Sequence, residues 1–203
     1  MKPTRLLVAS TNVKKLRELK ELLEGLDLEL LFLGDFQTSE VEETGKTFEE
    51  NAVLKAMGYA RQTGCLTLAE DSGLSCDALD GAPGVYSARF AGAGKSDAEN
   101  NAKLLRVLGS MPDNCRGAHY TSAVAVARPG ELLKTMQGEV YGVILTEARG
   151  TGGFGYDPLF FYPPYGKTFA EVSPELKHAV SHRAQALKSV RTFFEEFLQS
   201  APR

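Results

Sequence analysis

The stretch RLLVASTNVKKLRELKELL, residues 5–23, sets the fold class, because it joins two kinds of hydrophobic periodicity through one short turn. Its first part, Arg5 to Ala9, is a short apolar run that predicts a buried strand, and Ser10 to Asn12 predicts a turn. From Lys14 to Leu23 the leucines recur at helical spacing, which places them on one face. The stretch therefore predicts a strand, a turn and an amphipathic helix.

The same alternation of strand and helix continues along the chain. Capping boxes at Thr47–Glu50 and Ser96–Glu99 each open a segment with apolar residues at helical spacing. Between them, Leu66 to Ala69 predicts a buried strand, which we expect to stop at the Asp71-Ser72-Gly73 turn signal.

Towards the C-terminus, a hairpin interrupts this alternation. His119–Ala127 and Glu131–Val140 flank Pro129-Gly130 and predict two antiparallel strands. A short strand at Leu159–Tyr162 and a last helix capped by Ser181 follow. The order of elements predicts an α/β fold with a mixed sheet flanked by helices.

Composition narrows the class of protein. The chain has 203 residues, 43% hydrophobic and 24% charged, which suits one globular domain or a compact two-lobed one. The net charge of −3 disfavours binding to nucleic acid, and the apolar runs are too short for a membrane span or a secretory signal. Cys65, Cys76 and Cys115 lack metal-binding spacing, so we expect reduced thiols and a cytoplasmic location.

Two glycine-rich segments imitate nucleotide-binding motifs. Gly92–Ser96 resembles the end of a P-loop, but Arg89 stands where the first glycine is needed. The glycines of residues 150–155 fit a dinucleotide fingerprint, yet Tyr156-Asp157-Pro158 follows where a helix should begin. We therefore expect neither site, although these glycines would let the backbone approach a ligand closely.

Two groups of residues suggest an anion and a metal ion. Ser10–Lys15 lies at a predicted helix N-terminus, which suits a phosphate, although a capped surface helix with solvated lysines explains it equally well. Acidic residues at Glu40–Glu43 and at Glu70 and Asp71 offer the oxygen ligands that magnesium takes, although a solvated loop and a turn are the alternatives. Consecutive strand residues point to opposite faces, so Glu70 and Asp71 share one site only if the strand has ended.

A third group suggests a nucleobase. Phe154–Asp157 combines aromatic rings, which stack on bases, with a carboxylate that accepts from a base N–H. The alternative is a loop whose rings fill the core. Lys177, His182 and Arg183 add hydrogen-bond donors around the start of the last helix.

Together these segments resemble the inosine triphosphate pyrophosphatase family, the Ham1-like or RdgB-like pyrophosphatases of non-canonical purine nucleotides. The matching segments occur in the family's order and span nearly the whole chain: STNVKKLRE (Ser10–Glu18), EETGKTFEENAVLKA (Glu42–Ala56), AEDSGLSCDALDGAPGVYSARFAG (Ala69–Gly92), GTGGFGYDPLFF (Gly150–Phe161), GKTFAE (Gly166–Glu171) and SHRAQAL (Ser181–Leu187).

The resemblance implies a role for each matching residue. The magnesium ligands would be Glu43 and Asp71, with help from Glu70, and Asp71 would also be the general base. Which of Glu70 and Asp71 binds the metal and which takes the proton stays open, because a bound cation lowers the pKa of its ligand. The implied phosphate-binding residues are Ser10, Thr11, Asn12, Lys14 and Lys15. The implied substrate- and base-binding residues are Ser72, Phe154, Gly155, Tyr156, Asp157, Lys177, His182 and Arg183.

The resemblance also implies an activity and an architecture. The enzyme would be a magnesium-dependent hydrolase that converts ITP, dITP and XTP to monophosphate and pyrophosphate, clearing them from the nucleotide pool. The fold would be an elongated mixed sheet in a single two-lobed domain over residues 1–203, with the active site in the cleft and a homodimeric assembly. A pyrophosphatase with another base preference, as in the related Maf-like fold, and a non-catalytic nucleotide sensor are the alternatives.

Overall fold

The computed structural model describes residues 3–200, apart from the side chains of Val13, Lys14 and Ser200. Seven strands form one mixed sheet in the order β2-β1-β3-β4-β5-β6-β7. The strands are β1 (Thr4–Val8), β2 (Leu28–Phe32), β3 (Leu66–Cys76), β4 (Gly117–Arg128), β5 (Glu131–Ile144), β6 (Phe160–Tyr162) and β7 (Lys167–Thr168). The α-helices are α1 (Val13–Leu22), α2 (Phe48–Thr63), α3 (Asp97–Leu108), α4 (Pro174–Val180) and α5 (His182–Ser200).

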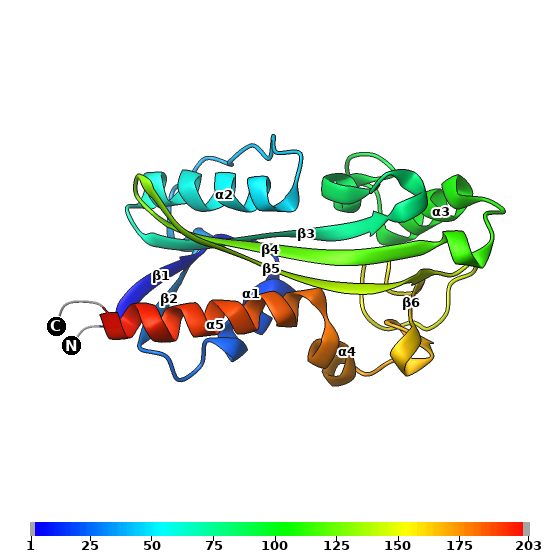
Figure 1. Cartoon of the computed structure of the whole chain (residues 1–203). Coiled ribbons are helices and arrows are strands. Elements are labelled where there is room, and N and C mark those ends of the chain that lie inside the picture. Colours follow the sequence, from blue (N-terminus) through cyan, green and yellow to red (C-terminus); the bar gives the residue numbers. More distant parts are fainter. Residues whose placement is uncertain (1–2, 201–203) are drawn as a thin grey trace. The chain divides into compact units, whose positions relative to one another are not determined.

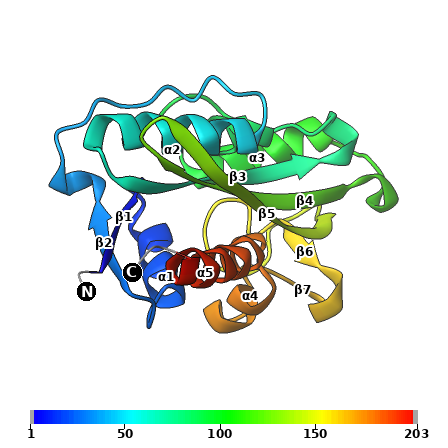
Figure 2. The same ribbon diagram turned by 60° about the vertical axis from the view of Figure 1, so that its left-hand side comes forward.

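The chain divides into two compact units. Unit 1 comprises the residues up to Asp71, Ser122–Gly138 and the residues from Gln185 on. Its strand β1 lies parallel to both β2 and β3. Helix α2 covers one face of its part of the sheet and α1 and α5 cover the other (Figures 1 and 2).

Unit 1 has its own apolar core. Leu6 and Val8 of β1 are buried together with Leu19 and Leu23 of the leucine face and with Phe194 of α5. The apolar run and the leucine face recognised in the sequence thus supply opposite sides of one core, because a strand and an amphipathic helix each bury one face.

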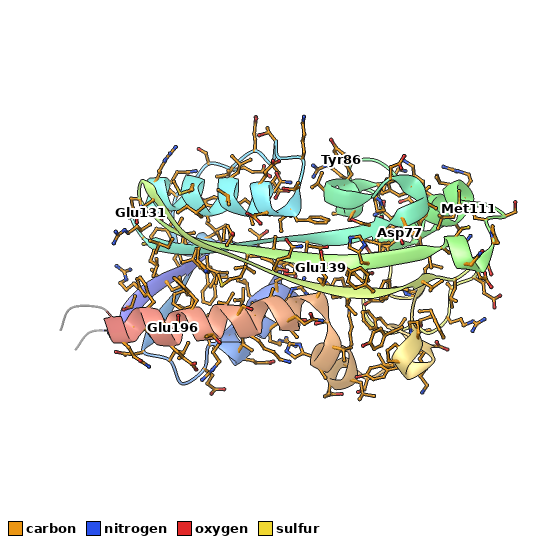
Figure 3. The ribbon with its side chains drawn as sticks, viewed as in Figure 1. Asp77, Tyr86, Met111, Glu131, Glu139 and Glu196 are labelled. Atoms are coloured by element: carbon orange, nitrogen blue, oxygen red, sulfur yellow. The ribbon has the colours of Figure 1, made fainter. Side chains whose placement is uncertain are left out.

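Unit 2 comprises Ser72–Thr121 and Glu139–Ala184. Strand β6 is antiparallel to both β5 and β7. Aromatic rings dominate its core, where Tyr120 lies within 5 Å of Phe160, centroid to centroid. Helix α3 and the 3-10 helix η3 (Gly84–Arg89) lie on the same side of the sheet, and the η3 residue Tyr86 projects outwards, 60% exposed (Figure 3).

Most predicted elements are confirmed, and with them the mixed α/β class. Both capping boxes form, with the Thr47 and Ser96 hydroxyls accepting from the backbone N–H groups of Glu50 and Glu99. The hairpin strands meet at Pro129-Gly130 but are longer than predicted, ending at Ile144. Strand β2, helix α4 and strand β7 are additional elements that the sequence analysis did not predict.

The predicted end of the third strand at Asp71 was wrong. Strand β3 continues through Asp71-Ser72-Gly73 to Cys76. A turn signal is a local preference. Strand β1 pairs with β3 only over Leu66–Leu68, so the neighbour that carries the backbone through the turn signal is β4.

Among the described residues, no helix combines the length and the apolar character needed to cross a bilayer. The three cysteines, which lie within this part of the chain, are free thiols of very different exposure. Burial, with a smaller effect of Asp77, raises the pKa of the Cys76 thiol to about 12, while Cys115 is exposed.

We predict that iodoacetamide at pH 8 modifies Cys115 but not Cys76 in the folded protein, because the thiolate is the reacting form and the Cys76 thiol is buried and protonated. Peptide mass spectrometry after labelling checks this. Labelling in denaturant, where all three thiols should react, is the control. Equal labelling of Cys76 and Cys115 in native protein would contradict the buried position of Cys76.

Candidate active site

The predicted phosphate-binding turn lies between β1 and α1 in unit 1. The Asn12 side-chain oxygen accepts from the backbone N–H of Lys15 at 3.3 Å, and the Ser10 hydroxyl accepts from the N–H of Asn12 at 3.1 Å. Asn12 therefore caps the helix, as the local alternative predicted, and both side chains order the turn. Thr11 is exposed. Lys14 was also predicted to bind phosphate, but its side chain is outside the part of the chain that the structure describes.

Lys15 connects this turn to strand β3. Its ammonium lies 3.7 Å from a carboxylate oxygen of Glu70, whose other oxygen accepts from the Ser122 hydroxyl at 2.9 Å. Glu70 is only 5% exposed. A buried carboxylate needs such partners, so Lys15 and Ser122 compensate the charge of Glu70.

Two acidic residues meet at Lys55 in unit 1. The Lys55 ammonium lies 2.9 Å from Glu43 and 3.1 Å from Asp71, measured to one carboxylate oxygen of each. The other oxygen of Asp71 accepts from the side-chain amide of Asn51 at 3.3 Å. We call Glu43, Asn51, Lys55 and Asp71 the Lys55 cluster.

The backbone around Gly45 lets Glu43 reach this cluster. The Gly45 N–H donates to the Asn51 side-chain oxygen at 2.8 Å, so Asn51, which is fully buried, holds both the loop and Asp71. A Cβ atom at Gly45 would lie 2.7 Å from that oxygen. No side chain fits there, which is why the loop needs glycine.

Electrostatics in the cluster leaves negative charge uncompensated. Burial raises the pKa of Asp71; Lys55 lowers it in part, and Glu43 raises it further. Burial alone would lower the pKa of Lys55, but Asp71 and Glu43 outweigh burial and raise it. The lysine therefore stays charged and faces two carboxylates.

Glu70 and Asp71 point to different partners, Glu70 to Lys15 and Asp71 to Lys55. This follows from the continuation of β3, because consecutive strand residues face opposite sides. Within residues 3–200 no three His, Cys, Asp or Glu side chains form a group that could hold a metal ion. The structure thus brings Glu43 and Asp71 together at Lys55, while Lys15, which pairs with Glu70, also lowers the pKa of Asp71.

The predicted base-binding loop belongs to unit 2, where Asp157 organises it. The Asp157 carboxylate is buried and accepts from the Phe154 backbone N–H at 2.8 Å and from the Lys177 ammonium. That ammonium lies 4.2 Å from the centre of the Phe154 ring, and the guanidinium carbon of Arg183 lies 5.9 Å from it. Phe154, Asp157, Lys177 and Arg183 form what we call the Phe154 cluster.

The other rings of this region have structural contacts. The Tyr156 hydroxyl donates to the Ser87 carbonyl at 2.8 Å, and the side chain is buried, as predicted by the alternative in which aromatics fill the core. His182 is buried and stacks on Tyr120 with ring centres 4.9 Å apart. The hydroxyl of Ser72 accepts from Arg183 at 3.5 Å, so Ser72 joins the Phe154 cluster rather than the acids.

Sequence reasoning missed Asn51 and Lys55. Both lie in the helix that follows the first capping box, four residues apart on the side that also buries Ala52 and Ala56. The sequence did contain a signal for them: two polar residues at helical spacing lie beside small apolar residues that face the core. Polar groups on such a face are buried and need hydrogen-bond partners, which marks them as candidate site residues.

The chain is similar in sequence to a known protein family over most of its length. Residues 6–193 match the model of the Ham1 family. The chain is 56% identical over 185 residues to a dITP/XTP pyrophosphatase of Geobacter sulfurreducens, covering 91% of this chain and 93% of that protein. A dITP/XTP pyrophosphatase of Desulforamulus reducens is 50% identical, with 91% and 92% covered.

Solved structures agree with this match. A HAM1 protein from Coxiella burnetii superposes with a TM-score of 0.90 at 41% identity, covering 95% of this chain and 99% of that one. A nucleoside-triphosphatase / dITP/XTP pyrophosphatase from Mycobacterium abscessus has a TM-score of 0.80 at 45% identity, with 92% and 97% covered.

We predict that Lys55→Met lowers the free energy of unfolding by on the order of 3 kcal/mol at pH 8, because it leaves two carboxylates without their shared cation. The loss should shrink at pH 5. Asp71 already has a raised pKa in the folded protein, and without Lys55 it rises further, so protonation then favours the folded state. Urea unfolding at both pH values measures this.

Lys95→Met is the matched control, because Lys95 forms a surface pair with Glu99 at 2.8 Å. Its effect on the free energy of unfolding should be much smaller than that of Lys55→Met, because solvent screens an exposed ion pair. A Lys55→Met protein as stable as this control at pH 8 would contradict the shared-cation interpretation.

We predict that Gly153→Ala is more destabilising than Gly155→Ala, although both glycines have positive φ angles, +72° and +61°. A Cβ atom at Gly153 would overlap the Asp157 carboxylate, whereas at Gly155 it would meet open space. The difference in unfolding free energy should be roughly 1–3 kcal/mol, the usual cost of overpacking. Equal destabilisation in urea titrations would show that Asp157 moves aside freely.

Proposed function

This chain belongs to the Ham1 family, and on that premise we propose that it hydrolyses ITP, dITP and XTP to the monophosphate and pyrophosphate. The observation that carries the proposal is the Lys55 cluster, in which two carboxylates face one ammonium. The relatives named dITP/XTP pyrophosphatase support the choice of substrates. Such an activity would keep these nucleotides out of DNA and RNA.

We propose that Glu43 and Asp71 hold Mg²⁺. Both carboxylates converge on one cation, and their oxygens are the ligands that magnesium prefers. Burial, together with the neighbouring Glu43, raises the pKa of Asp71 despite Lys55, so a further cation would favour the ionised carboxylate. When bound, the ion would neutralise phosphate charge and lower the pKa of water. Glu70 as a further ligand stays a prediction, since its observed partners are Lys15 and Ser122.

In the proposed reaction, side chains of the protein accept the proton of the attacking water and stabilise the charges of the phosphates. Asp71 takes the proton from the attacking water, whose oxygen bonds to the α-phosphorus while the bond from that phosphorus to the oxygen bridging to the β-phosphate breaks and pyrophosphate leaves. A lysine ammonium has three N–H donors, so Lys55 keeps one for a phosphate oxygen while facing both acids. Lys15 and the N–H groups of the Ser10–Lys15 turn stabilise charge on the leaving pyrophosphate.

The Phe154 cluster would select the base. The half-buried Phe154 ring stacks on the purine, and Lys177, His182 and Arg183 supply donors for a 6-oxygen. Adenine carries an amino group at this position, so it would leave buried donors unpaired, which is costly.

The remaining parts of the proposal rest mainly on the family. We propose that residues 1–203 act as one catalytic domain, that the protein is a homodimer, and that it works in the cytoplasm. The three free thiols support the last point.

We predict magnesium-dependent pyrophosphate release from ITP, dITP and XTP, with much slower release from ATP, dTTP and CTP. Asp71→Asn should lower turnover by at least about 100-fold, because it removes the base. Asp113→Asn, at an exposed position, is the control and should keep full activity.

Two results would overturn parts of this proposal. Equal release from all nucleotides would remove base selection while keeping the hydrolase. Tight ITP binding without release would make the protein a nucleotide sensor.

A further inference from the structure

Helix α3 holds the peptide groups on both sides of Gly155. The Gly155 N–H donates to the Asp97 carboxylate at 2.6 Å, and the Gly155 carbonyl accepts from the Asn101 side-chain amide at 2.8 Å. Asp97 and Asn101 are four residues apart, so they lie on one face of the helix. All three residues belong to unit 2. We call Asp97 and Asn101 the Gly155 clamp.

Gly155 needs such a clamp. Its φ is +61°, and around an added Cβ there would be no atom within 4 Å, so packing does not fix its conformation. Glycine visits many backbone conformations at little cost. Hydrogen bonds to both flanking peptide groups remove that freedom.

The helix is a firm support for the clamp. The capping box of Ser96 and Glu99 orders its first turn. Asn100 is buried and bonds the backbone at Ala91, at 2.7 Å, and Ala88. An anionic Asp97 in the first turn is also favoured by the helix dipole.

We propose that Asp97 and Asn101 are positioning residues that set base selectivity by fixing Phe154 through Gly155. This rests on the proposed function. The two residues share one peptide bond, so rotation at Gly155 would move the Phe154 ring away from Lys177 and strain the Phe154 N–H bond to Asp157. Polar recognition needs its groups placed within about 0.5 Å, so the discrimination between bases depends on the clamp.

The variants come in two pairs. Asn101→Asp keeps the shape of the side chain but sets a carboxylate oxygen against the Gly155 carbonyl, whereas Asp97→Ala deletes the acceptor. Asp97→Asn keeps an acceptor oxygen and is the conservative rescue. Glu99→Gln is the structural control, since Glu99 lies in the same turn and contacts Lys95 and Ser96.

Asn101→Asp and Asp97→Ala should raise KM for ITP about tenfold or more with kcat changed less than about threefold, because a displaced Phe154 ring weakens base stacking while the groups at the phosphates stay in place. The ratio of kcat/KM for ITP over ATP should fall with it. Asp97→Asn should restore both values to near wild type. Amide hydrogen exchange at Gly155, read by NMR, should speed up in Asp97→Ala but not in Asp97→Asn.

The outcomes separate this inference from the proposed function. An unchanged KM and selectivity ratio in both Asn101→Asp and Asp97→Ala would overturn the clamp, as would the same KM shift in Glu99→Gln. If circular dichroism shows that Asn101→Asp does not fold, the comparison of Asp97→Ala with Asp97→Asn tests the clamp instead. A wild-type protein inactive on every nucleotide would overturn the proposed function and this inference with it, whatever the exchange rate at Gly155.

Discussion

The proposed chemistry of unit 1 depends on one half-buried ammonium, that of Lys55, which lies between two carboxylates. Ionised Glu43 and Asp71 repel each other, and the Lys55 ammonium, 2.9 Å and 3.1 Å from their oxygens, offsets that repulsion. The surrounding features all serve this contact. Asn51 holds Asp71, Gly45 lets the Glu43 loop approach, and the helix that supplies Lys55 begins at a capping box. The cluster keeps one net negative charge, which suits a further cation.

In unit 2 the main feature is the fixed position of the Phe154 ring and of the hydrogen-bond donors beside it. The Phe154 segment contains several glycines, yet it is held at many points: Asp157 binds the Phe154 backbone, Tyr156 reaches the Ser87 carbonyl, and α3 holds Gly155. The glycines here serve close approach and positive φ angles more than mobility. In the proposed reaction, the phosphates of the substrate would be recognised by charge. Its base would be recognised by shape and hydrogen bonding.

Local signals predicted the parts of the fold that depend on near neighbours. Both capping boxes and the Ser181 cap form through contacts three residues apart, so the sequence contains both partners. The mixed sheet followed from the order of the elements. The end of β3 was mispredicted because β4, a neighbour that is distant in sequence, lies beside the strand past the end of β1 and overrode a local turn signal.

The candidate site was predictable in part. Glu43, Asp71 and Phe154 were identified through motif resemblance, but their partners depend on the fold. Lys55 meets Asp71 across 16 positions, and Glu70 meets Ser122 across 52. No spacing rule reaches that far, so only the folded chain shows that Glu70 and Asp71 face different partners.

The central claim is that Asp71 belongs to a half-buried cluster in which two carboxylates share the Lys55 ammonium and which accepts a divalent ion. The most direct measurement is a carbon-13 NMR titration of the Asp71 carboxyl group, with and without Mg²⁺. The account predicts a pKa above the ordinary value of 3.8 in metal-free protein and a clear fall when Mg²⁺ is added. A pKa at or below 3.8 that Mg²⁺ does not move would contradict it.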